Sequence, residues 1–193
     1  MLFVPHPLPT APATRRPLGA REERELVRAA QQSDASAFEA LFRAHWPMAY
    51  RAAWLIVRDE QLAEDIAQES FLAAAGALDR FDRRRPFGPW LRTIVARRAI
   101  DAGRKVAVRR EVGDEALGQL RAEQPPVEAL EGELLDALAA LPLDQRSVVV
   151  LRHLLGMSLG EIAAVLDVPR GTVNSRLRRG LDALRPSVEE PAP

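Results

Sequence analysis

An arginine-rich segment near the C-terminal end of the chain has residue types that bind nucleic acids. Between Arg170 and Arg185 there are five arginines and one acidic residue, Asp182, so the local charge is +4. On a helix, one face would carry the apolar residues Val173, Leu177, Leu181 and Leu184. The side chains pointing away from that face would be Gly171, Thr172, Ser175, Arg178 and Arg179. A guanidinium can donate two parallel hydrogen bonds to a phosphate or a guanine edge, so this face suits contact with DNA.

The residues before this segment predict the helix and the turn that a DNA-reading helix needs. Ser158 and Glu161 fit a capping box, in which two side chains satisfy free backbone N–H groups at a helix start. Asp167 and Val168 form the expected turn. Pro169 suits the first position of the next helix, because the N–H that it lacks would have no partner there. The pattern is typical of a helix-turn-helix whose second helix enters the major groove.

An ordinary solvated surface is the alternative for this helix, because charged segments are most often solvated faces. The capped helix and the tight turn before it favour DNA binding. We therefore expect the helix from Arg170 to contact DNA.

The charge of the chain is zero overall but unevenly distributed. Seven basic residues and one acid between Trp90 and Arg110 give a second basic segment of charge +6. Eight acids and one base between Glu111 and Asp136 give a connector of charge −7. Two basic segments suggest two contacts along one polyanion. The acidic connector could instead neutralise its basic neighbours in the free protein. The two interpretations are compatible if DNA displaces the connector from the basic segments.

Several classes of function are excluded by composition. There is no cysteine, which excludes disulfides, cysteine nucleophiles and thiolate metal sites, and the three histidines are scattered. No acid–base pair, nucleophile or phosphate loop is recognisable, so we expect no enzyme and no cofactor. No apolar segment reaches membrane-spanning length and no secretory signal begins the chain, so a cytoplasmic protein is expected.

The predicted fold is all-α, with two small helical domains joined by a flexible linker. No segment shows the alternating pattern of a β-strand. A proline-rich N-terminal extension, expected to be disordered, covers residues 1–20. The expected parts after it are a first domain over 21–105, a linker over 106–127, a second domain with the helix-turn-helix over 128–185, and a tail over 186–193.

Within the first domain, local signals predict four helices. Asp34 is the expected cap of a long second helix, which Pro47 interrupts or kinks and which ends at Arg58. A third helix is expected over about 60–78. After a loop over 79–89 that holds four arginines, a fourth helix is expected to start near Pro89 and to end at about Lys105.

Four segments of the chain resemble the extracytoplasmic-function sigma factors of the sigma-70 family. The resemblance covers most of the chain outside the tails and the linker, and the four segments together are more specific than any one alone. They are AEDIAQESFLAA (63–74), FDRRRPFGPWLRTIVARRAIDAGRK (81–105), LPLDQRSVVVLRHLLGMSLGEIA (141–163) and VPRGTVNSRLRRGLDALR (168–185). The resemblance implies a protein that binds core RNA polymerase and directs initiation at promoters with −10 and −35 elements.

The first segment is similar to the helix with which this family binds core polymerase. The resemblance implies contacts by Asp65, Gln68 and Glu69. On spacing alone, an ordinary exposed helix face is the better interpretation of these residues. Because exposed ion pairs contribute only roughly 0–1 kcal/mol each, such a surface must act together with apolar neighbours.

The second segment is similar to the part of the family that holds the non-template strand of the −10 element. In its loop Arg80, Arg83, Arg84 and Arg85 are expected to contact phosphates, and Phe87 to pack or to stack on a base. Phe81 and Trp90 are expected in the core. The helix after the loop would offer the DNA backbone Arg92, Arg97, Arg98 and Arg104.

The last segment is similar to the −35 recognition helix. The resemblance directs Asn174, Ser175, Arg178 and Arg179 towards base edges or the nearby backbone, although a helical wheel leaves Asn174 to the side. Phosphate contacts are expected from Arg170, Thr172 and Arg176.

The expected partners are core RNA polymerase, promoter DNA and an anti-sigma factor. Two other functions stay open. A conventional helix-turn-helix regulator would bind operators as a dimer, and would not need the segments over 63–74 and 81–105. A sigma-like decoy that binds anti-sigma factors should have lost its basic recognition face, which is intact here.

Overall fold

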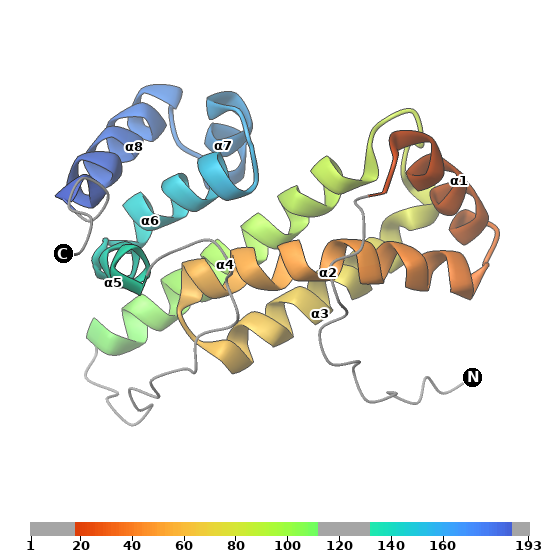
Figure 1. Cartoon of the computed structure of the whole chain (residues 1–193), viewed down its shortest axis with the longest axis horizontal. Coiled ribbons are helices and arrows are strands. Elements are labelled where there is room, and N and C mark those ends of the chain that lie inside the picture. Colours follow the sequence, from red (N-terminus) through yellow and green to blue (C-terminus); the bar gives the residue numbers. More distant parts are fainter. Residues whose placement is uncertain (1–17, 112–131, 187–193) are drawn as a thin grey trace.

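The computed structural model describes residues 18–111 and 132–186, and all the regular secondary structure in these ranges is helical (Figure 1). This confirms the all-α prediction, and the described ranges contain no strand. The predictions of a disordered extension, a flexible linker and a frayed tail fall mainly outside the described residues.

The first four helices pack around one apolar core. They are α1 (Ala20–Gln31), α2 (Ala35–Val57), α3 (Glu60–Ala77) and α4 (Phe87–Glu111), with a short 3-10 turn, η1 (Leu78–Arg80), after α3. Their fully buried large side chains include Leu41, Trp54, Ile56, Phe87 and Leu91. The Asp34 carboxylate caps α2 by accepting from the N–H groups of Ser36 and Ala37, as expected.

Two features of the helices differ from the prediction. Of the interruption or kink predicted at Pro47, the interruption is absent, because α2 continues through this residue. Pro47 is exposed, so the carbonyl four residues earlier, which receives no N–H from the proline, lies where water can bind it. α4 starts at Phe87 and runs past Lys105 to Glu111, into the range predicted to be linker. Val106 and Ala107, which lie in that range, are half-buried and helical.

The last four α-helices, with a short π-helical segment, form the predicted helix-turn-helix and its support. The α-helices are α5 (Gly132–Ala140), α6 (Leu143–Val149), α7 (Leu159–Leu166) and α8 (Arg170–Leu184), and the π-helical segment η2 (Val150–Leu154) follows α6. Ser158 and Glu161 form the capping box of α7. Asp167 ends α7 with a left-handed φ of 54°. Pro169 is the residue just before α8 and not its first helical residue, one position from the prediction.

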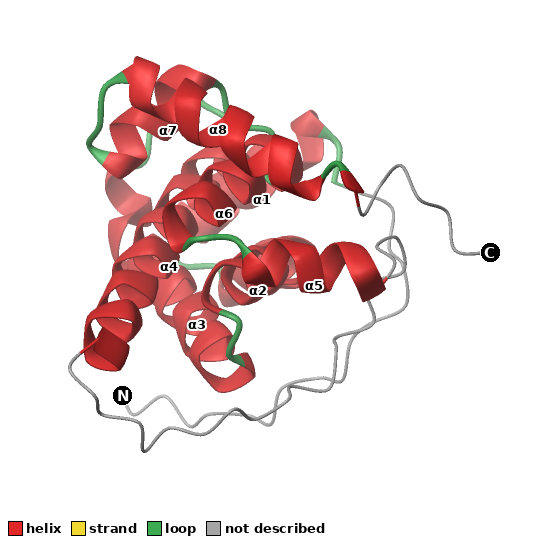
Figure 2. Ribbon diagram, turned by 90° about the vertical axis from the view of Figure 1, so that its left-hand side faces the viewer, coloured by secondary structure: helices red, strands yellow, loops and turns green. Residues whose placement is uncertain are grey.

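The two sets of helices pack against each other. α6 and α7 lie along α4, and η2 lies against α2 (Figures 1 and 2). Gly103 permits this approach, because a Cβ atom there would be only 2.9 Å from Leu143 Cδ1. The guanidinium of Arg104 also reaches the carbonyl of Leu166 at the end of α7, at 3.5 Å.

Candidate nucleic-acid interface

The outward face of α8 is basic and open to solvent. Arg170, Asn174, Arg178 and Arg179 are all exposed, and α8 lies at the outer edge of the molecule, with α7 between it and α4 (Figure 1). Among the described residues, no carboxylate lies within ion-pair distance of Arg170, Arg178 or Arg179. Three arginines without acidic partners on one exposed helix make a surface that attracts phosphates.

Other predicted residues of α8 are partly occupied within the protein. Thr172 and Ser175 are half-buried, and the Ser175 hydroxyl donates to the Thr172 carbonyl at 2.9 Å. The side chain of Arg176 is 21% exposed, and its Nη2 lies 2.5 Å from Asp144 Oδ2 of α6. A phosphate contact by Arg176 would have to compete with this ion pair. In the structure the Arg176 side chain instead joins α8 to α6.

The loop before α4 presents consecutive arginines to solvent. We call residues 81–86 the arginine loop; it contains Arg83, Arg84 and Arg85, which are exposed, as is Arg80 just before it. The Asp82 carboxylate accepts from the Arg84 N–H at 3.0 Å, and the Arg85 N–H donates to the Asp82 carbonyl at 2.9 Å. This turn holds the three guanidinium groups on the outside.

Phe87 does not belong to this exposed surface. Its side chain is 1% exposed and packs with Phe81 and Trp90, with ring centroids 6.0 and 5.6 Å away. A ring at this depth cannot stack on a base, so the prediction that placed Phe87 among the DNA-binding residues is corrected. Phe81 is buried and Trp90 half-buried, as expected.

The arginines along α4 lie in different surroundings. Arg97 is exposed, whereas Arg98 makes an ion pair with Glu69 of α3, at 2.7 Å. Arg104 reaches α7, and half-buried Arg92 lies close enough to Glu161 of α7 to help lower the pKa of that carboxyl, after the larger effect of Ser158. Two arginines of the second basic segment, Arg92 and Arg104, therefore lie beside α7 in this arrangement.

The acidic face of α3 is exposed and borders an apolar side chain. Asp65 and Glu69 are exposed, and Gln68 is half-buried and donates to Glu64 at 3.2 Å. Leu72, on the next turn, is 66% exposed. The face thus combines carboxylates with the apolar neighbour that an interface of this kind requires.

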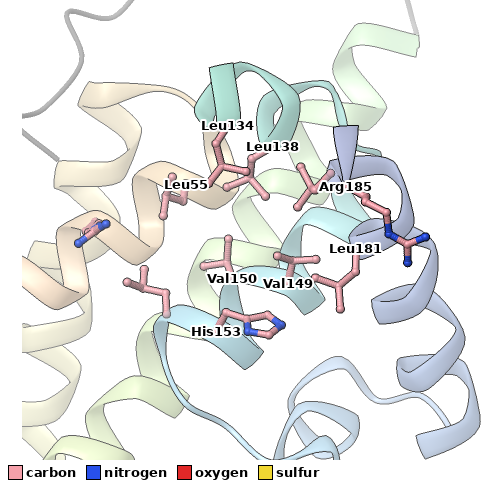
Figure 3. A pocket seen from close by; sticks show the side chains of 11 residues that line it. Leu55, Leu134, Leu138, Val149, Val150, His153, Leu181 and Arg185 are labelled. Atoms are coloured by element: carbon pink, nitrogen blue, oxygen red, sulfur yellow. The ribbon is translucent and has the colours of Figure 1, made fainter. Parts of the chain in front are cut away.

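A cavity of about 480 Å³ lies between the two sets of helices. Figure 3 shows Leu55 of α2, Leu138 of α5, Val150 of η2 and Leu181 of α8 around it. Arg185 and His153 also line it. This cavity was not predicted from the sequence. One lining residue, Leu181, belongs to the predicted apolar face of α8, and the structure shows that its side chain is 40% exposed.

Two residues of α1 contact the ends of the arginine loop and were also missed. Gln31 binds the carbonyls of Leu78 and Phe81, and Glu23 binds the N–H groups that begin α4. No local pattern points to these contacts, because the partners are far apart in the sequence.

Some kinds of site are absent from the described part of the chain. Residues 18–111 and 132–186 hold no group of three histidine, aspartate or glutamate side chains placed to bind a metal ion. Within the same ranges, no helix combines the length and the apolar character needed to cross a membrane.

Two family models match the chain, one over each set of helices. A model described as Sigma-70 region 2 matches residues 41–109, and one described as Sigma-70, region 4 matches residues 131–184. Among curated proteins, the chain is 36% identical over 157 residues to RNA polymerase sigma factor CarQ of Myxococcus xanthus, covering 80% of this chain and 90% of CarQ. It is 30% identical over 178 residues to ECF RNA polymerase sigma factor SigW of Bacillus subtilis, covering 85% of this chain and 95% of SigW.

Solved structures agree with this similarity. The structure of CnrH in complex with the cytosolic domain of CnrY matches with a TM-score of 0.59 and 30% identity, covering 87% of this chain and 97% of that one. The sigma factor RpoE of Bartonella quintana, solved in complex with the anti-sigma factor NepR, matches with a TM-score of 0.63 at 23% identity. It covers 80% of this chain and 98% of that one, and at this identity it supports the fold alone.

Proposed function

The chain belongs to the extracytoplasmic-function group of the sigma-70 family, and on this premise we propose which of its surfaces binds core polymerase and which bind the two promoter elements. As a sigma factor it binds core RNA polymerase and promoter DNA and directs transcription initiation. In our assignment, helices α1–α4 contact core polymerase and the −10 element, and helices α5–α8 contact the −35 element.

The −35 element is read by α8. The observation that carries this assignment is the exposed, unpaired arginine face of a helix held by a capped helix-turn-helix. Base edges are contacted by Asn174, Arg178 and Arg179, and Arg170 and the first N–H groups of α8 contact phosphate. Thr172 and Ser175 lie at the margin of this contact. Arg176 supports the helix from behind through Asp144.

The −10 element is held by the arginine loop and α4. Arg80, Arg83, Arg84 and Arg85 bind the phosphates of the unpaired strand, and the exposed Arg97 extends the basic surface along α4. In the closed arrangement exposed Arg104 donates to α7 and half-buried Arg92 lies close to α7, so both residues gain room for DNA when α7 moves away from α4. We therefore propose that the two domains separate when the protein binds a promoter, and that the closed arrangement belongs to the free protein.

Core RNA polymerase is bound by the exposed face of α3. Asp65, Gln68 and Glu69 supply the polar contacts, and Leu72 supplies the apolar surface beside them. The Arg98–Glu69 ion pair joins this face to α4, so the polymerase-binding surface on α3 and the DNA-binding surface on α4 are adjacent.

An anti-sigma factor is the proposed regulator. CnrH and the Bartonella RpoE were both solved in complexes with partner proteins, and the second partner is an anti-sigma factor. The apolar cavity between α2, α5, η2 and α8 is where we place an apolar segment of such a partner (Figure 3). The chain itself supplies no catalytic residue, since phosphodiester chemistry belongs to the polymerase, and it works in the cytoplasm, where the chromosome lies.

Two variants separate these assignments. Asp65→Arg should abolish capture of core polymerase while leaving the isolated protein folded. The double change of Arg178 and Arg179 to Ala should leave core capture intact and abolish binding of the holoenzyme to −35 duplex DNA. If Asp65→Arg protein still captured core as well as the wild type does, the assignment of α3 would be wrong.

A further inference from the structure

Helix α1 binds the backbone on both sides of the arginine loop. Figure 1 shows α1 beside the loop that leads into α4. The Gln31 amide donates to the carbonyls of Leu78 and Phe81, each at 2.9 Å. At the other end, the Glu23 carboxylate accepts from the N–H groups of Phe87 and Gly88, at 3.1 and 3.3 Å. The loop is therefore fastened at its start and at its end by one helix.

The Glu23 carboxylate acts as a helix cap supplied from another element. The first N–H groups of a helix have no partner within the helix. Pro86 precedes α4, and a proline side chain has no acceptor to offer them. A carboxylate at this position also interacts favourably with the helix dipole. The Glu23 side chain is only 13% exposed, so water cannot easily replace it.

His45 of α2 holds the Glu23 carboxylate in place. Its Nε2 lies 3.0 Å from Glu23 Oε1, and because a carboxylate only accepts, Nε2 carries the proton. This hydrogen bond is the largest effect that lowers the pKa of Glu23, and it outweighs the opposing effect of burial. A Cβ atom on Gly88 would lie 3.2 Å from His45 Cε1, which is a tight contact, so glycine leaves room for the histidine at the start of α4.

The two contacts of α1 are spaced by its own geometry. Glu23, Val27 and Gln31 lie one helical turn apart along a single row, and Val27 between them is 2% exposed in the core. The two polar side chains are thus held about 12 Å apart along the helix axis. We call Glu23 and Gln31 the α1 brace.

We propose that the α1 brace positions the arginine loop for capture of the unpaired −10 strand, with Glu23 and Gln31 as positioning residues. The inference rests on the proposed function, in which this loop holds that strand. A loop whose ends are fixed loses less conformational freedom when it binds a ligand. Removing the brace should therefore weaken strand binding while leaving core binding unchanged.

The test uses holoenzyme made from core polymerase and Glu23→Ala, Gln31→Ala or the double variant. The probe is a single-stranded oligonucleotide with the non-template −10 sequence of a promoter that the wild-type protein recognises. Each single variant should weaken binding of this probe by about tenfold, the scale set by loss of a charge-assisted or buried hydrogen bond. The affinities for core polymerase and for −35 duplex DNA should change by less than about twofold, which also shows that the variants are folded.

Matched controls and a conservative variant make the result specific. Glu22→Ala and Gln32→Ala remove the neighbouring exposed side chains of the same types and should bind the probe like the wild type. Glu23→Gln keeps an oxygen that can accept from Phe87 and Gly88, and should recover much of the lost binding. Unchanged probe binding in the double variant would overturn the brace, as would a parallel loss of core and probe binding. A wild-type holoenzyme that transcribes from the promoter yet does not bind the probe would overturn the −10 assignment of the loop itself, and the brace with it.

Discussion

The guanidinium of Arg146, in α6, binds the backbone of the other domain at Ile56. Its Nε donates to the Ile56 carbonyl in the last turn of α2, at 3.0 Å. Its Nη1 donates to the carbonyls of Ala139 and Leu141, at 2.8 and 3.3 Å. The last carbonyls of a helix have no partner within the helix, so one side chain serves the ends of two helices from different domains.

Arg146→Ala should loosen the closed arrangement. Carbonyls left without donors cost about 1–3 kcal/mol when they are buried, and some of that loss falls on the contact between the domains. The chain has no cysteine, so cysteines introduced at Gly76 and Ala183, which face open space or solvent, can be labelled for a distance measurement. The variant should show a longer and broader distance distribution than the wild type.

The matched control for this measurement is Arg152→Ala. Arg152 also donates to a carbonyl, that of Met157, but within its own domain. The distance distribution should therefore stay as in the wild type. If Arg146→Ala also left the distribution unchanged, Arg146 would not contribute to holding the domains together.

Arg179→Ala should weaken transcription that depends on the −35 element. A guanidinium bound to guanine contributes about 1–3 kcal/mol of discrimination between bases. Transcription from a target promoter should fall, and the fall should shrink when the −35 element is scrambled. Arg28→Ala removes the same charge from α1 and should transcribe normally. Equal output from Arg179→Ala and wild-type protein would contradict the role of Arg179.

Ser158→Ala should destabilise the helix-turn-helix. The Ser158 hydroxyl accepts from the Glu161 N–H at 3.2 Å, and the Glu161 carboxylate accepts from the Ser158 N–H at 2.8 Å. Loss of an N-cap hydroxyl costs about 0.5–2 kcal/mol, which urea unfolding can measure. Ser158→Thr keeps the hydroxyl and should recover most of that stability. A Thr variant as unstable as the Ala variant would argue against the capping role.

The Glu23 contacts predict a pH dependence of stability. The hydrogen bond from His45 is the main reason why the pKa of Glu23 lies below its usual 4.5. A carboxyl whose pKa is lowered on folding stabilises the folded state above its unfolded pKa, and this contribution is lost as the pH falls through the folded pKa. Glu23→Gln should therefore be less stable than the wild type at neutral pH, with the difference shrinking below pH 4.5.

The measurement is the free energy of unfolding of the wild type and of Glu23→Gln, taken from neutral pH to below pH 4.5. Glu22→Gln is the control, because it changes an exposed carboxyl next to Glu23. Its stability difference from the wild type should stay nearly constant with pH. A constant difference for Glu23→Gln as well would mean that the carboxylate makes no contribution specific to the folded state.

The sequence predicted the features that depend on local chemistry. The capping box of Ser158 and Glu161, the turn at Asp167 and the cap at Asp34 each involve residues within three positions of each other. The basic face of α8 followed from helical periodicity. Short-range sequence patterns are therefore enough to predict the helix-turn-helix and the outward face of its second helix.

Features that depend on packing could not be read from the sequence. Glu23 and Phe87 are 64 positions apart, and Arg146 and Ile56 are 90 apart, so no local pattern joins them. The sequence left open whether Phe87 packs in the protein or stacks on a base, and only the structure shows its ring packed against Phe81 and Trp90. The sequence does not separate Arg176 from its neighbouring arginines, because its ion-pair partner Asp144 lies in another helix.

The most direct test of the account is transcription with purified components. The protein is added to core RNA polymerase, and run-off transcripts from genomic DNA of its own organism are sequenced. The account predicts new start sites that share one pair of −35 and −10 elements, and that disappear with Asp65→Arg. Binding to DNA without binding to core polymerase, and without new starts, would contradict it and would indicate a conventional helix-turn-helix regulator.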